Sequence, residues 1–239
     1  MNVDVVIPAL DEEPAIGDVV RSFIGRVREV VVADNGSRDR TAEVAREAGA
    51  RVVSAPRRGY GNACLAALAE LAPGCDVVVF ADADGSDDPA DLDGLVAPIV
   101  SGEADLVIGS RVRGVMEAGA LTPQQRMGNA LAATWLRWRF GQPATDLGPF
   151  RAVRKESLDR LHMSDPTYGW TIEMQIKAAR AGMRYTEVPV AYRRRKAGTS
   201  KVSGTLRGIA GASAKILGLL AYYDVVQRSA LAQRLWRRF

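Results

Sequence analysis

The stretch Val77-Val78-Val79-Phe80-Ala81-Asp82-Ala83-Asp84-Gly85-Ser86 decides the fold class of this chain. It is a short run of β-branched and aromatic residues that ends in acidic residues and glycine, which is typical of a strand leading into a loop. Because the run is apolar at successive positions, the strand needs cover on both faces, as in a parallel sheet with helices on each side. The stretch therefore predicts an α/β protein with a polar loop at the carboxyl end of an inner strand.

The first 110 residues repeat this pattern. Apolar runs bounded by turn residues predict strands at 3–7, 29–33, 51–53, 76–81 and 105–109. Helical periodicity predicts helices at 14–25, 40–49, 61–72 and 89–100. Strands and helices that alternate in this way predict a Rossmann-like, mostly parallel sheet with helices on both faces.

The second half of the chain is less regular. It predicts helices at 124–140, 155–161 and 171–181, and extended segments at 146–153 and 184–190. We expect one main domain over residues 1–204, followed by a C-terminal amphipathic helix and basic tail over 205–239. The apolar tract at 208–223 is interrupted by Lys215 and diluted by glycine and alanine, so no transmembrane helix is expected there.

Composition narrows the range of partners. The chain has 239 residues and a net charge of +4, but acidic residues dominate its first part and basic residues its second. This asymmetry predicts an anionic partner, either a phosphorylated ligand or an anionic membrane surface. Nucleic acid is not expected, because no zinc-finger spacing, aromatic RNA-binding strand or recognition-helix pattern is present. Two cysteines and the lack of a recognisable leader favour a cytoplasmic protein.

Asp82 and Asp84 are the strongest chemical signal. In an extended segment, residues two apart project to the same side, so both carboxylates could approach one hard cation that also binds a diphosphate. Such a cation neutralises a departing nucleoside diphosphate as a Lewis acid. The alternative is an acidic turn that caps the next helix. An EF-hand is excluded, because its loop needs glycine at the sixth position, where this chain has Asp87.

Polar loops also follow the other predicted strands, and all of them should converge on one edge of the sheet. The loops at 11–13 and 34–39 could hydrogen-bond a nucleoside, or they could be ordinary turns and helix caps. The segment Gly59-Tyr60-Gly61-Asn62 should place backbone amides at a helix start, which predicts an anion site. It is neither a P-loop nor a dinucleotide fingerprint, because it lacks their further lysine or glycine.

In their order and spacing, these motifs resemble family-2 glycosyltransferases of the GT-A fold. The resemblance covers most of residues 3–200 and rests on Val5-Val6-Ile7-Pro8-Ala9-Leu10-Asp11-Glu12-Glu13, on Asp34-Asn35-Gly36-Ser37-Arg38-Asp39-Arg40-Thr41, on Gly59-Tyr60-Gly61-Asn62-Ala63 and on Asp82-Ala83-Asp84-Gly85-Ser86. Within the family it is greatest to the dolichyl- and polyprenyl-phosphate sugar synthases. That likeness rests on Gly109-Ser110-Arg111, Asp146-Leu147-Gly148-Pro149-Phe150-Arg151, Tyr168-Gly169-Trp170-Thr171-Ile172-Glu173-Met174, Val188-Pro189-Val190 and Gly198-Thr199-Ser200-Lys201.

The resemblance implies roles for particular residues. Asp82 and Asp84 would meet Mg²⁺ or Mn²⁺ together with the diphosphate of the donor. The nucleotide-sugar pocket would be lined by Pro8, Leu10, Glu12, Asp34, Gly59, Asn62, Asp82 and Ala83. The acceptor phosphate would be held by Arg111, Arg126, Arg151 and Lys201, since the guanidinium group is suited to bidentate phosphate binding.

The chain departs from the resembled pattern in three places. Ser86 stands where some relatives carry glutamine, which leaves its part in the metal site open. Many lipid-phosphate relatives read closer to Asp-x-Thr-x-Gly-Phe-Arg where this chain has Asp146 to Arg151. Several relatives also carry membrane helices, which are not expected here. The acceptor is therefore less strongly indicated than the donor.

The family inverts the anomeric carbon by direct displacement, so the acceptor decides whether a base is needed. A hydroxyl acceptor requires a general base, for which Asp146 and Glu173 are the candidates. A phosphate acceptor is already ionised at pH 7 and requires none. The structural alternatives are an ion pair of Asp146 with Arg151 or Arg154 and one of Glu173 with Lys177.

Residues 192–201 and 206–220 complete the interpretation. The first segment is basic and rich in small residues, so it is either a loop that closes over phosphates or a solvated face. The second has helical apolar spacing and either lies on an anionic membrane, packs on the core, or forms a homodimer contact.

The sequence therefore predicts a glycosyltransferase that moves a sugar from a UDP- or GDP-sugar to polyprenyl phosphate at the cytoplasmic face of a membrane. A soluble hydroxylated acceptor and a non-catalytic nucleotide-sugar or lipid-binding protein are the alternatives. A sugar-nucleotide pyrophosphorylase is disfavoured, because Pro8 to Glu13 replaces the glycine-rich signature expected near the N-terminus.

Overall fold

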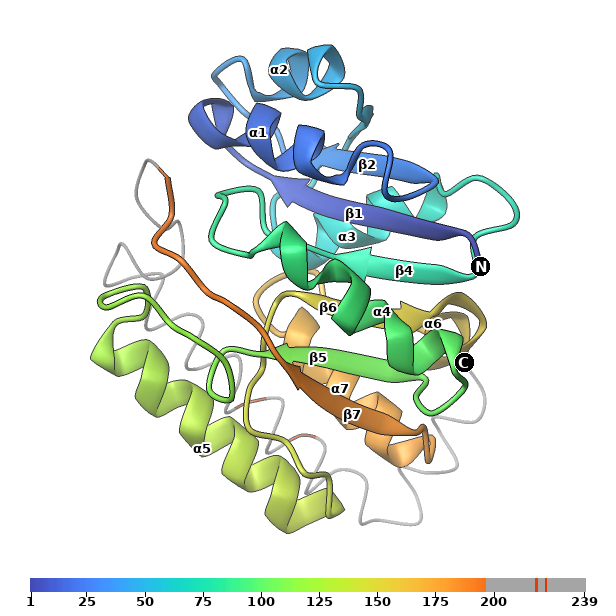
Figure 1. The fold of residues 1–239 in the computed structure, drawn as a ribbon, viewed down its shortest axis with the longest axis vertical. Coiled ribbons are helices and arrows are strands. Elements are labelled where there is room, and N and C mark those ends of the chain that lie inside the picture. Colours follow the sequence, from blue (N-terminus) through green and yellow to red (C-terminus); the bar gives the residue numbers. More distant parts are fainter. Residues whose placement is uncertain (197–217, 219–221, 223–239) are drawn as a thin grey trace. The chain divides into compact units, whose positions relative to one another are not determined.

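The computed structural model describes residues 1–196, 218 and 222 (Figure 1). The chain divides into two compact units, Met1–Thr199 and Ser200–Phe239. Apart from Gly218 and Tyr222, the predicted C-terminal helix and basic tail over 205–239 lie outside the described residues. Within the part of the chain that the structure describes, no helix combines the length and the apolar character that crossing a membrane requires.

The strands of residues 1–196 form one seven-stranded sheet with the order β3-β2-β1-β4-β6-β5-β7. These strands are β1 (Val3–Ala9), β2 (Glu29–Asp34), β3 (Arg51–Ser54), β4 (Val77–Phe80), β5 (Leu106–Ser110), β6 (Arg151–Arg154) and β7 (Tyr185–Pro189). β6 runs antiparallel to its neighbours β4 and β5, and the other pairings are parallel. The predicted mostly parallel sheet is therefore confirmed.

Helices cover both faces of this sheet. They are α1 (Glu13–Phe23), α2 (Thr41–Glu47), α3 (Tyr60–Ala69), α4 (Leu92–Val100), α5 (Pro123–Phe140), α6 (Lys155–Leu161) and α7 (Trp170–Arg180), and a short 3₁₀ turn, Pro89–Asp91, precedes α4. In Figure 1, α1 and α4 lie in front of the sheet, whereas α3 and α7 lie behind it.

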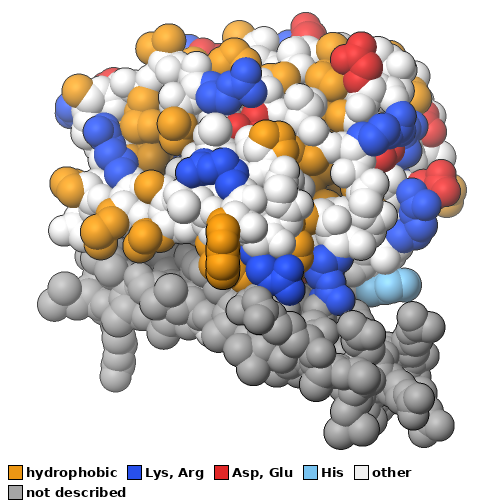
Figure 2. All heavy atoms as spheres, turned by 90° about the horizontal axis from the view of Figure 1, so that it is seen from below, with side chains coloured by type: hydrophobic (Ala, Val, Ile, Leu, Met, Phe, Trp, Pro, Cys, Tyr) orange, Lys and Arg blue, Asp and Glu red, His pale blue; other side chains and the backbone are white. Residues whose placement is uncertain are grey.

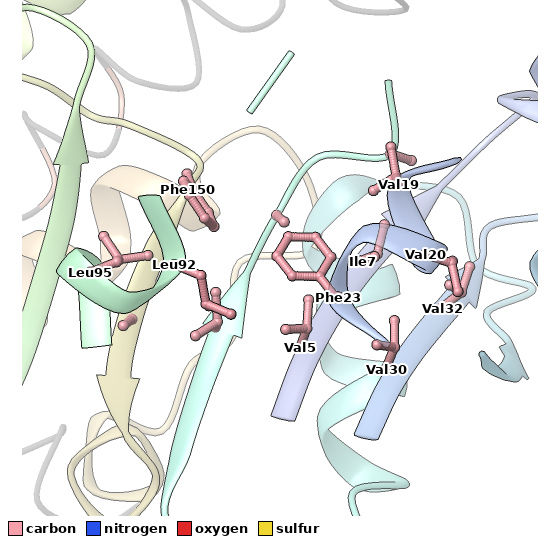
Figure 3. Close-up of a cluster of buried hydrophobic side chains, with 14 of the residues drawn as sticks. Val5, Ile7, Val19, Val20, Phe23, Val30, Val32, Leu92, Leu95 and Phe150 are labelled. Atoms are coloured by element: carbon pink, nitrogen blue, oxygen red, sulfur yellow. The ribbon is translucent and has the colours of Figure 1, made fainter. Parts of the chain in front are cut away.

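The alternation of side chains along each strand creates a separate core on each face. Val5 and Ile7 pack with Phe23 of α1 in one cluster, which also contains Leu92 and Leu95 of α4 and Phe150 (Figure 3). Val6, which lies between them in β1, points to the other face of the sheet. There it belongs to a second cluster with residues of α3, α6 and α7. Because side chains of a strand point to opposite faces in turn, the fully apolar β4 contributes to both cores.

Helix α5 has well-defined ends. The Thr122 hydroxyl accepts a hydrogen bond from the Gln125 backbone, and the Gln125 side chain accepts one from the Thr122 backbone, so the two form a capping box. Gly141 ends the helix with a φ of 67°, a left-handed conformation that glycine adopts at little cost. The two caps bound a helix of 18 residues.

Candidate active site at the carboxyl edge of the sheet

The carboxyl ends of β1, β2, β4, β5 and β7 lie along one edge of the sheet, which we call the carboxyl edge (Figure 1). The segment before β6 reaches the same edge, because that strand runs in the opposite direction. After β7 the chain turns along this edge and passes the loop that follows β4. The predicted convergence of the strand-end loops is therefore observed.

The loop after β4 holds Asp82 and Asp84 in a tight turn. The Oδ1 atom of Asp84 accepts hydrogen bonds from the Ser86 backbone at 2.9 Å and from the Ser86 hydroxyl at 2.6 Å. The Asp82 amide donates to Oδ2 of Asp87 at 2.9 Å. Ser86 thus orients a carboxylate of the predicted metal pair instead of facing it as a ligand would.

This loop concentrates negative charge. Burial, and then repulsion from Asp84, raise the pKa of Asp82 to about 7. Burial and repulsion from Asp82 also raise the pKa of Asp87. The Oδ1 atom of Asp87 is buried without a hydrogen-bond partner among the described residues. A buried cluster of this kind favours either protons or an added cation.

Arg195 supplies the cation that meets the loop in this structure. Its Nη2 atom lies 2.9 Å from Oδ2 of Asp84 and 2.9 Å from Oε1 of Glu12. The backbone amides of Arg193 and Lys196 donate to Ser86 and Asp84, which fixes the segment 193–196 against the loop. The sequence shows a run of basic residues there, but the residue that reaches the carboxylates is only visible in the fold.

The site fits a divalent cation. Asp82 and Asp84 offer carboxylate oxygens. A bound cation would offset the repulsion among the carboxylates of this loop. The described residues contain no group of three or more acidic, histidine or cysteine side chains that could hold a metal by itself. Two carboxylates suit Mg²⁺, which is usually bound through one or two carboxylates together with waters and substrate phosphates.

The predicted nucleotide residues lie on the adjoining strand ends. Pro8 is the penultimate residue of β1, Leu10 directly follows that strand, and Asp34 ends β2 in register with Ala9. The Glu12 amide donates to Thr41 at 2.8 Å, which ties the loop after β1 to α2. These contacts place the side chains on one side of the Asp82–Asp84 loop.

The prediction of an anion site at Gly59 to Asn62 is wrong. The amide of Gly59 donates to Asn35, and those of Gly61 and Asn62 donate to carbonyls of Thr167 and Pro166. A Cβ atom at Gly61 would lie 1.8 Å from the Asp165 carbonyl oxygen. Both glycines therefore allow close backbone packing, and these three amides already have hydrogen-bond partners within the protein.

Asn35 has a structural role, which agrees with the alternative that the loop at 34–39 is an ordinary turn. Its side-chain amide donates to the carbonyls of Ala55 and Arg57 at 2.8 and 2.7 Å, and its carbonyl accepts from Gly59. Its position in a polar motif resembled that of a ligand-binding residue. In the fold it joins the ends of β2 and β3 to the start of α3.

Arg111 and Asp146 form the second half of the site. The carboxylate of Asp146 accepts from the Arg111 backbone and Nε at 2.8 Å and from Nη2 at 2.6 Å. The Arg111 guanidinium also lies 5.0 Å from the centre of the Tyr192 ring. Burial is the largest influence and lowers the pKa of Arg111, but the hydrogen bonds to Asp146 and the negative charge of that carboxylate together raise it. Arg111 is therefore charged and rigidly held.

Glu187 of β7 orders the segment around Asp146. It accepts from the Thr145 amide at 2.7 Å and the Thr145 hydroxyl at 2.5 Å, and from the Tyr185 hydroxyl at 2.6 Å. The Gln175 side chain donates to the Asp146 carbonyl at 2.9 Å. The strand end, α7 and the 145–147 segment therefore behave as one hydrogen-bonded unit.

The structure corrects the predicted partner of Asp146. That partner is Arg111 and neither Arg151 nor Arg154. Arg151 is fully buried and donates to the carbonyls of Leu147, Gly148 and Thr171. With its donors committed to backbone oxygens, Arg151 cannot also hold an acceptor phosphate, so that assignment is wrong.

The alternative predicted for Glu173 is confirmed. Its carboxylate pairs with Lys177 at 2.8 Å and accepts from the backbone amides of Ser164 and Asp165. Glu173 and Lys177 are both buried, so the pair closes the loop before α7. These contacts favour a structural role over that of a base.

The remaining acceptor residues differ in their placement. Arg126 lies in the first turns of α5, exposed, with Nη2 3.8 Å from the sulfur of Met116. Met116 in turn forms a backbone β-bridge with Tyr192, and the ring of Tyr192 packs against the Arg111 guanidinium. Lys201 lies outside the described residues. Arg111 and Arg126 are thus the members of the predicted set that reach the same part of the edge.

Comparison with known proteins agrees with this geometry. The family model for glycosyl transferase family 2 matches residues 4–161, which include the strands β1 to β5 and the Asp82–Asp84 loop. The chain belongs to glycosyltransferase family 2. An uncharacterized glycosyltransferase of Mycobacterium tuberculosis is 41% identical to this chain. The similarity covers 94% of this chain and 97% of the relative.

Two further relatives differ in the acceptors that their names state. The dolichyl-phosphate hexose transferase of Haloferax volcanii is 35% identical, over 86% of this chain and 89% of the relative. Glucosyl-3-phosphoglycerate synthase of M. tuberculosis, crystallised with Mn²⁺, UDP-glucose and phosphoglyceric acid, has 28% identity and a TM-score of 0.75, over 93% of this chain and 79% of that structure. The GT-A fold expected from the sequence is confirmed by this structural similarity.

Proposed function

We propose that this glycosyltransferase moves a sugar from a UDP- or GDP-sugar to a polyprenyl phosphate, with Mg²⁺ or Mn²⁺ at Asp82 and Asp84, at the cytoplasmic face of a membrane. The Haloferax relative acts on a lipid phosphate, and the mycobacterial structure holds a nucleotide sugar with Mn²⁺. Pro8, Leu10, Glu12, Asp34 and Ala83 would line the nucleotide pocket.

The state of the two candidate bases is the observation that carries this proposal. Asp146 is committed to Arg111 and Glu173 to Lys177, and both carboxylates are buried. A hydroxyl acceptor needs a base within hydrogen-bond reach, whereas a phosphate acceptor is ionised already. Carboxylates that are occupied in this way favour an acceptor that needs no base.

Each half of the site would contribute a separate part of the reaction. A divalent cation, when bound, would neutralise charge on the departing nucleoside diphosphate. Asp82 and Asp84 would hold that cation, and Arg195 would give up its contact with Asp84. Arg111 and Arg126 would position the acceptor phosphate and offset its repulsion from the donor phosphates. The acceptor oxygen would attack from the side opposite the diphosphate and invert the anomeric carbon.

A soluble phosphorylated acceptor is the second candidate. It is favoured by the similarity to the mycobacterial synthase, whose crystals contain phosphoglyceric acid. The same arginines would bind the phosphate of such a molecule, but its attacking oxygen would be a hydroxyl, which needs a base, whereas a lipid phosphate needs none. The two candidates differ in the apolar tail, which only an assay with both acceptors distinguishes.

Release of nucleoside diphosphate tests the proposal. UDP- and GDP-sugars are supplied with Mn²⁺ or Mg²⁺, alone, with a short-chain polyprenyl phosphate, or with 3-phosphoglycerate. We expect the lipid phosphate to stimulate release, and Asp84→Ala to reduce it at least about a hundredfold. Asp93→Ala is the matched control, because that carboxylate is 88% exposed and lies on α4.

The outcomes separate the alternatives. Stimulation by 3-phosphoglycerate alone would replace the lipid acceptor by a soluble one. Donor binding without release under any condition would favour a non-catalytic protein. Release that Asp84→Ala leaves unchanged would remove the metal assignment from Asp82 and Asp84.

A further inference from the structure

Helix α5 has a second apolar face that points away from the core. Its inner face buries Ala132, Ala133 and Leu136. Its outer face carries Met127, Leu131 and Trp138, which are 62%, 60% and 73% exposed. Residues four and eleven positions apart lie on the same side of a helix, so these three side chains form one stripe.

The three side chains of the stripe also line a shallow, mostly apolar depression. Its lining consists of Met127, Ala130, Leu131, Thr134, Trp135 and Trp138. The ring of Trp135 packs edge-on against Phe140, with centroids 5.3 Å apart, which stiffens the end of the face. A large contiguous patch of exposed apolar side chains often marks an interaction site.

The charge on this helix identifies the kind of partner. α5 contains Arg126, Arg137 and Arg139 and no acidic residue. The face of the molecule shown in Figure 2 likewise has Lys and Arg side chains among its hydrophobic groups, and the acidic side chains gather toward its upper right. A helix with tryptophan and aliphatic residues beside arginines is typical of helices that lie in the headgroup region of an anionic bilayer.

Helix α5 is hydrogen-bonded to a segment of the candidate site. Asn129 of α5 donates to the Thr145 carbonyl at 3.2 Å and accepts from the Leu147 amide at 2.8 Å. These residues flank Asp146, the partner of Arg111. The helix that carries the outer face is therefore hydrogen-bonded to the segment that holds Arg111, and it also carries Arg126 in its first turns.

We propose that the outer face of α5, with Met127, Leu131 and Trp138 at its centre, docks the protein on an anionic lipid bilayer. The three side chains enter the interfacial region, and the arginines of the helix meet the lipid phosphates. The benefit to catalysis rests on the proposed function, since docking would bring a lipid-linked acceptor to Arg111 and Arg126. The docking itself does not depend on sugar transfer.

Vesicle co-sedimentation of the full chain tests the docking. The vesicles contain phosphatidylcholine and phosphatidylglycerol at about 3:1, or phosphatidylcholine alone. We expect the double variant Leu131→Ser/Trp138→Ser to bind the anionic vesicles at least about tenfold more weakly than wild type, because two apolar side chains leave the interface. We expect wild type to bind the neutral vesicles more weakly than the anionic ones.

The matched control is Ile24→Ser/Val100→Ser, at two exposed apolar positions beyond α1 and in α4 that are 45% and 53% exposed. This variant should bind vesicles as wild type does. Circular dichroism and the unfolding temperature of each variant verify that the fold is retained. Equal vesicle binding by the α5 variant and wild type, or no binding by wild type, would overturn the proposal.

Two further measurements distinguish membrane docking from the proposed function and from dimer formation. Transfer to a short, water-soluble polyprenyl phosphate without vesicles should be unchanged in the α5 variant. If no transfer occurs with any polyprenyl phosphate while the variant still loses vesicle binding, the docking holds and the proposed acceptor fails. If light scattering shows a dimer that the variant dissociates, and vesicles are not bound, the occupant is a second copy and the docking is wrong.

Discussion

Two acidic regions at the carboxyl edge have opposite surroundings. Asp146 is fully buried and receives three hydrogen bonds from Arg111, and its neighbours are fixed by Glu187 and Gln175. Asp82 and Asp84 stand beside Asp87, so that like charges face one another. Their counter-charge comes from Arg195, which belongs to a segment far along the chain.

The surroundings of these carboxylates indicate a structural role for Asp146 and a ligand-binding role for Asp82 and Asp84. When a buried carboxylate has a buried cationic partner, removal of either member leaves an uncompensated charge and strongly destabilises the fold. A cluster of carboxylates with too little positive charge costs stability by itself and gains from a bound cation. Asp146 therefore positions Arg111, whereas the Asp82–Asp84 loop is suited to bind something that the chain does not supply.

The largest effect expected from this comparison is on stability. Asp146→Asn should lower the free energy of unfolding by about 3 kcal/mol, because it leaves the Arg111 charge buried without its partner. Asp84→Asn should change that free energy by less than about 0.5 kcal/mol or raise it, because it relieves repulsion. Urea denaturation of both variants measures the difference.

A double variant sharpens this prediction. Asp146→Asn/Arg111→Met should be more stable than Asp146→Asn alone, because the unpaired charge is gone. If the Asp146→Asn protein is as stable as wild type, Asp146 contributes no more to the stability of the fold than Asp84 does. The comparison between the two regions would then fail.

The next effect concerns the cation that meets the loop. Arg195→Gln should tighten Mn²⁺ binding to the donor-free protein by about tenfold, because a guanidinium at 2.9 Å from Asp84 no longer competes for that carboxylate. Electron paramagnetic resonance of unbound Mn²⁺ measures the affinity without any turnover.

Arg194→Gln is the control for this measurement. Arg194 belongs to the same segment, but it pairs with Glu117 and contacts the Ala118 carbonyl, away from the loop. It should leave Mn²⁺ affinity unchanged. Weaker Mn²⁺ binding in Arg195→Gln would mean that Arg195 supports the metal site instead of occupying its place.

The smallest effect comes from a carboxylate whose pKa shifts in the opposite direction. Hydrogen bonds from Arg184 lower the pKa of Asp105 to about 2, whereas the pKa of Asp82 is raised. A lowered pKa in the folded state means that the stabilisation is complete above the unfolded value, about 4, and is lost as the pH falls toward 2.

Asp105→Asn should therefore lower the free energy of unfolding by about 1 kcal/mol at pH 7 and by almost nothing at pH 2. The effect is small because the Arg184 side chain is 54% exposed and solvent screens the pair. Chemical denaturation at pH 7, 4 and 2 measures it. A destabilisation independent of pH would show that packing of Asp105, and not its charge, matters.

Much of the fold was predictable from local pattern. Each expected strand of the first half overlaps an observed one, as for β2, expected at 29–33 and found at Glu29–Asp34. The predicted helix at 124–140 corresponds to α5, Pro123–Phe140. These segments succeed because periodicity and turn residues act within a few positions of one another.

The site was predictable only in part. The loop with Asp82 and Asp84 was identified, because a buried strand followed by two acidic residues carries its own signal. The role of Gly59 to Asn62 was misjudged, because the carbonyls of Pro166 and Thr167 that satisfy their amides lie about a hundred residues away in the chain. Arg195 was overlooked, because four consecutive basic residues look equivalent in sequence.

The sequence by itself determined the α/β architecture, the edge where polar loops gather and the acidic character of the loop after β4. These properties follow from hydrophobic alternation and residue type, which are local. Only the tertiary structure decided which charges meet: Arg195 reaches Glu12 across 183 residues, and Asp146 takes Arg111 in place of its nearby arginines. Such pairings depend on how strands are ordered in the sheet, and short-range patterns carry no information about that order.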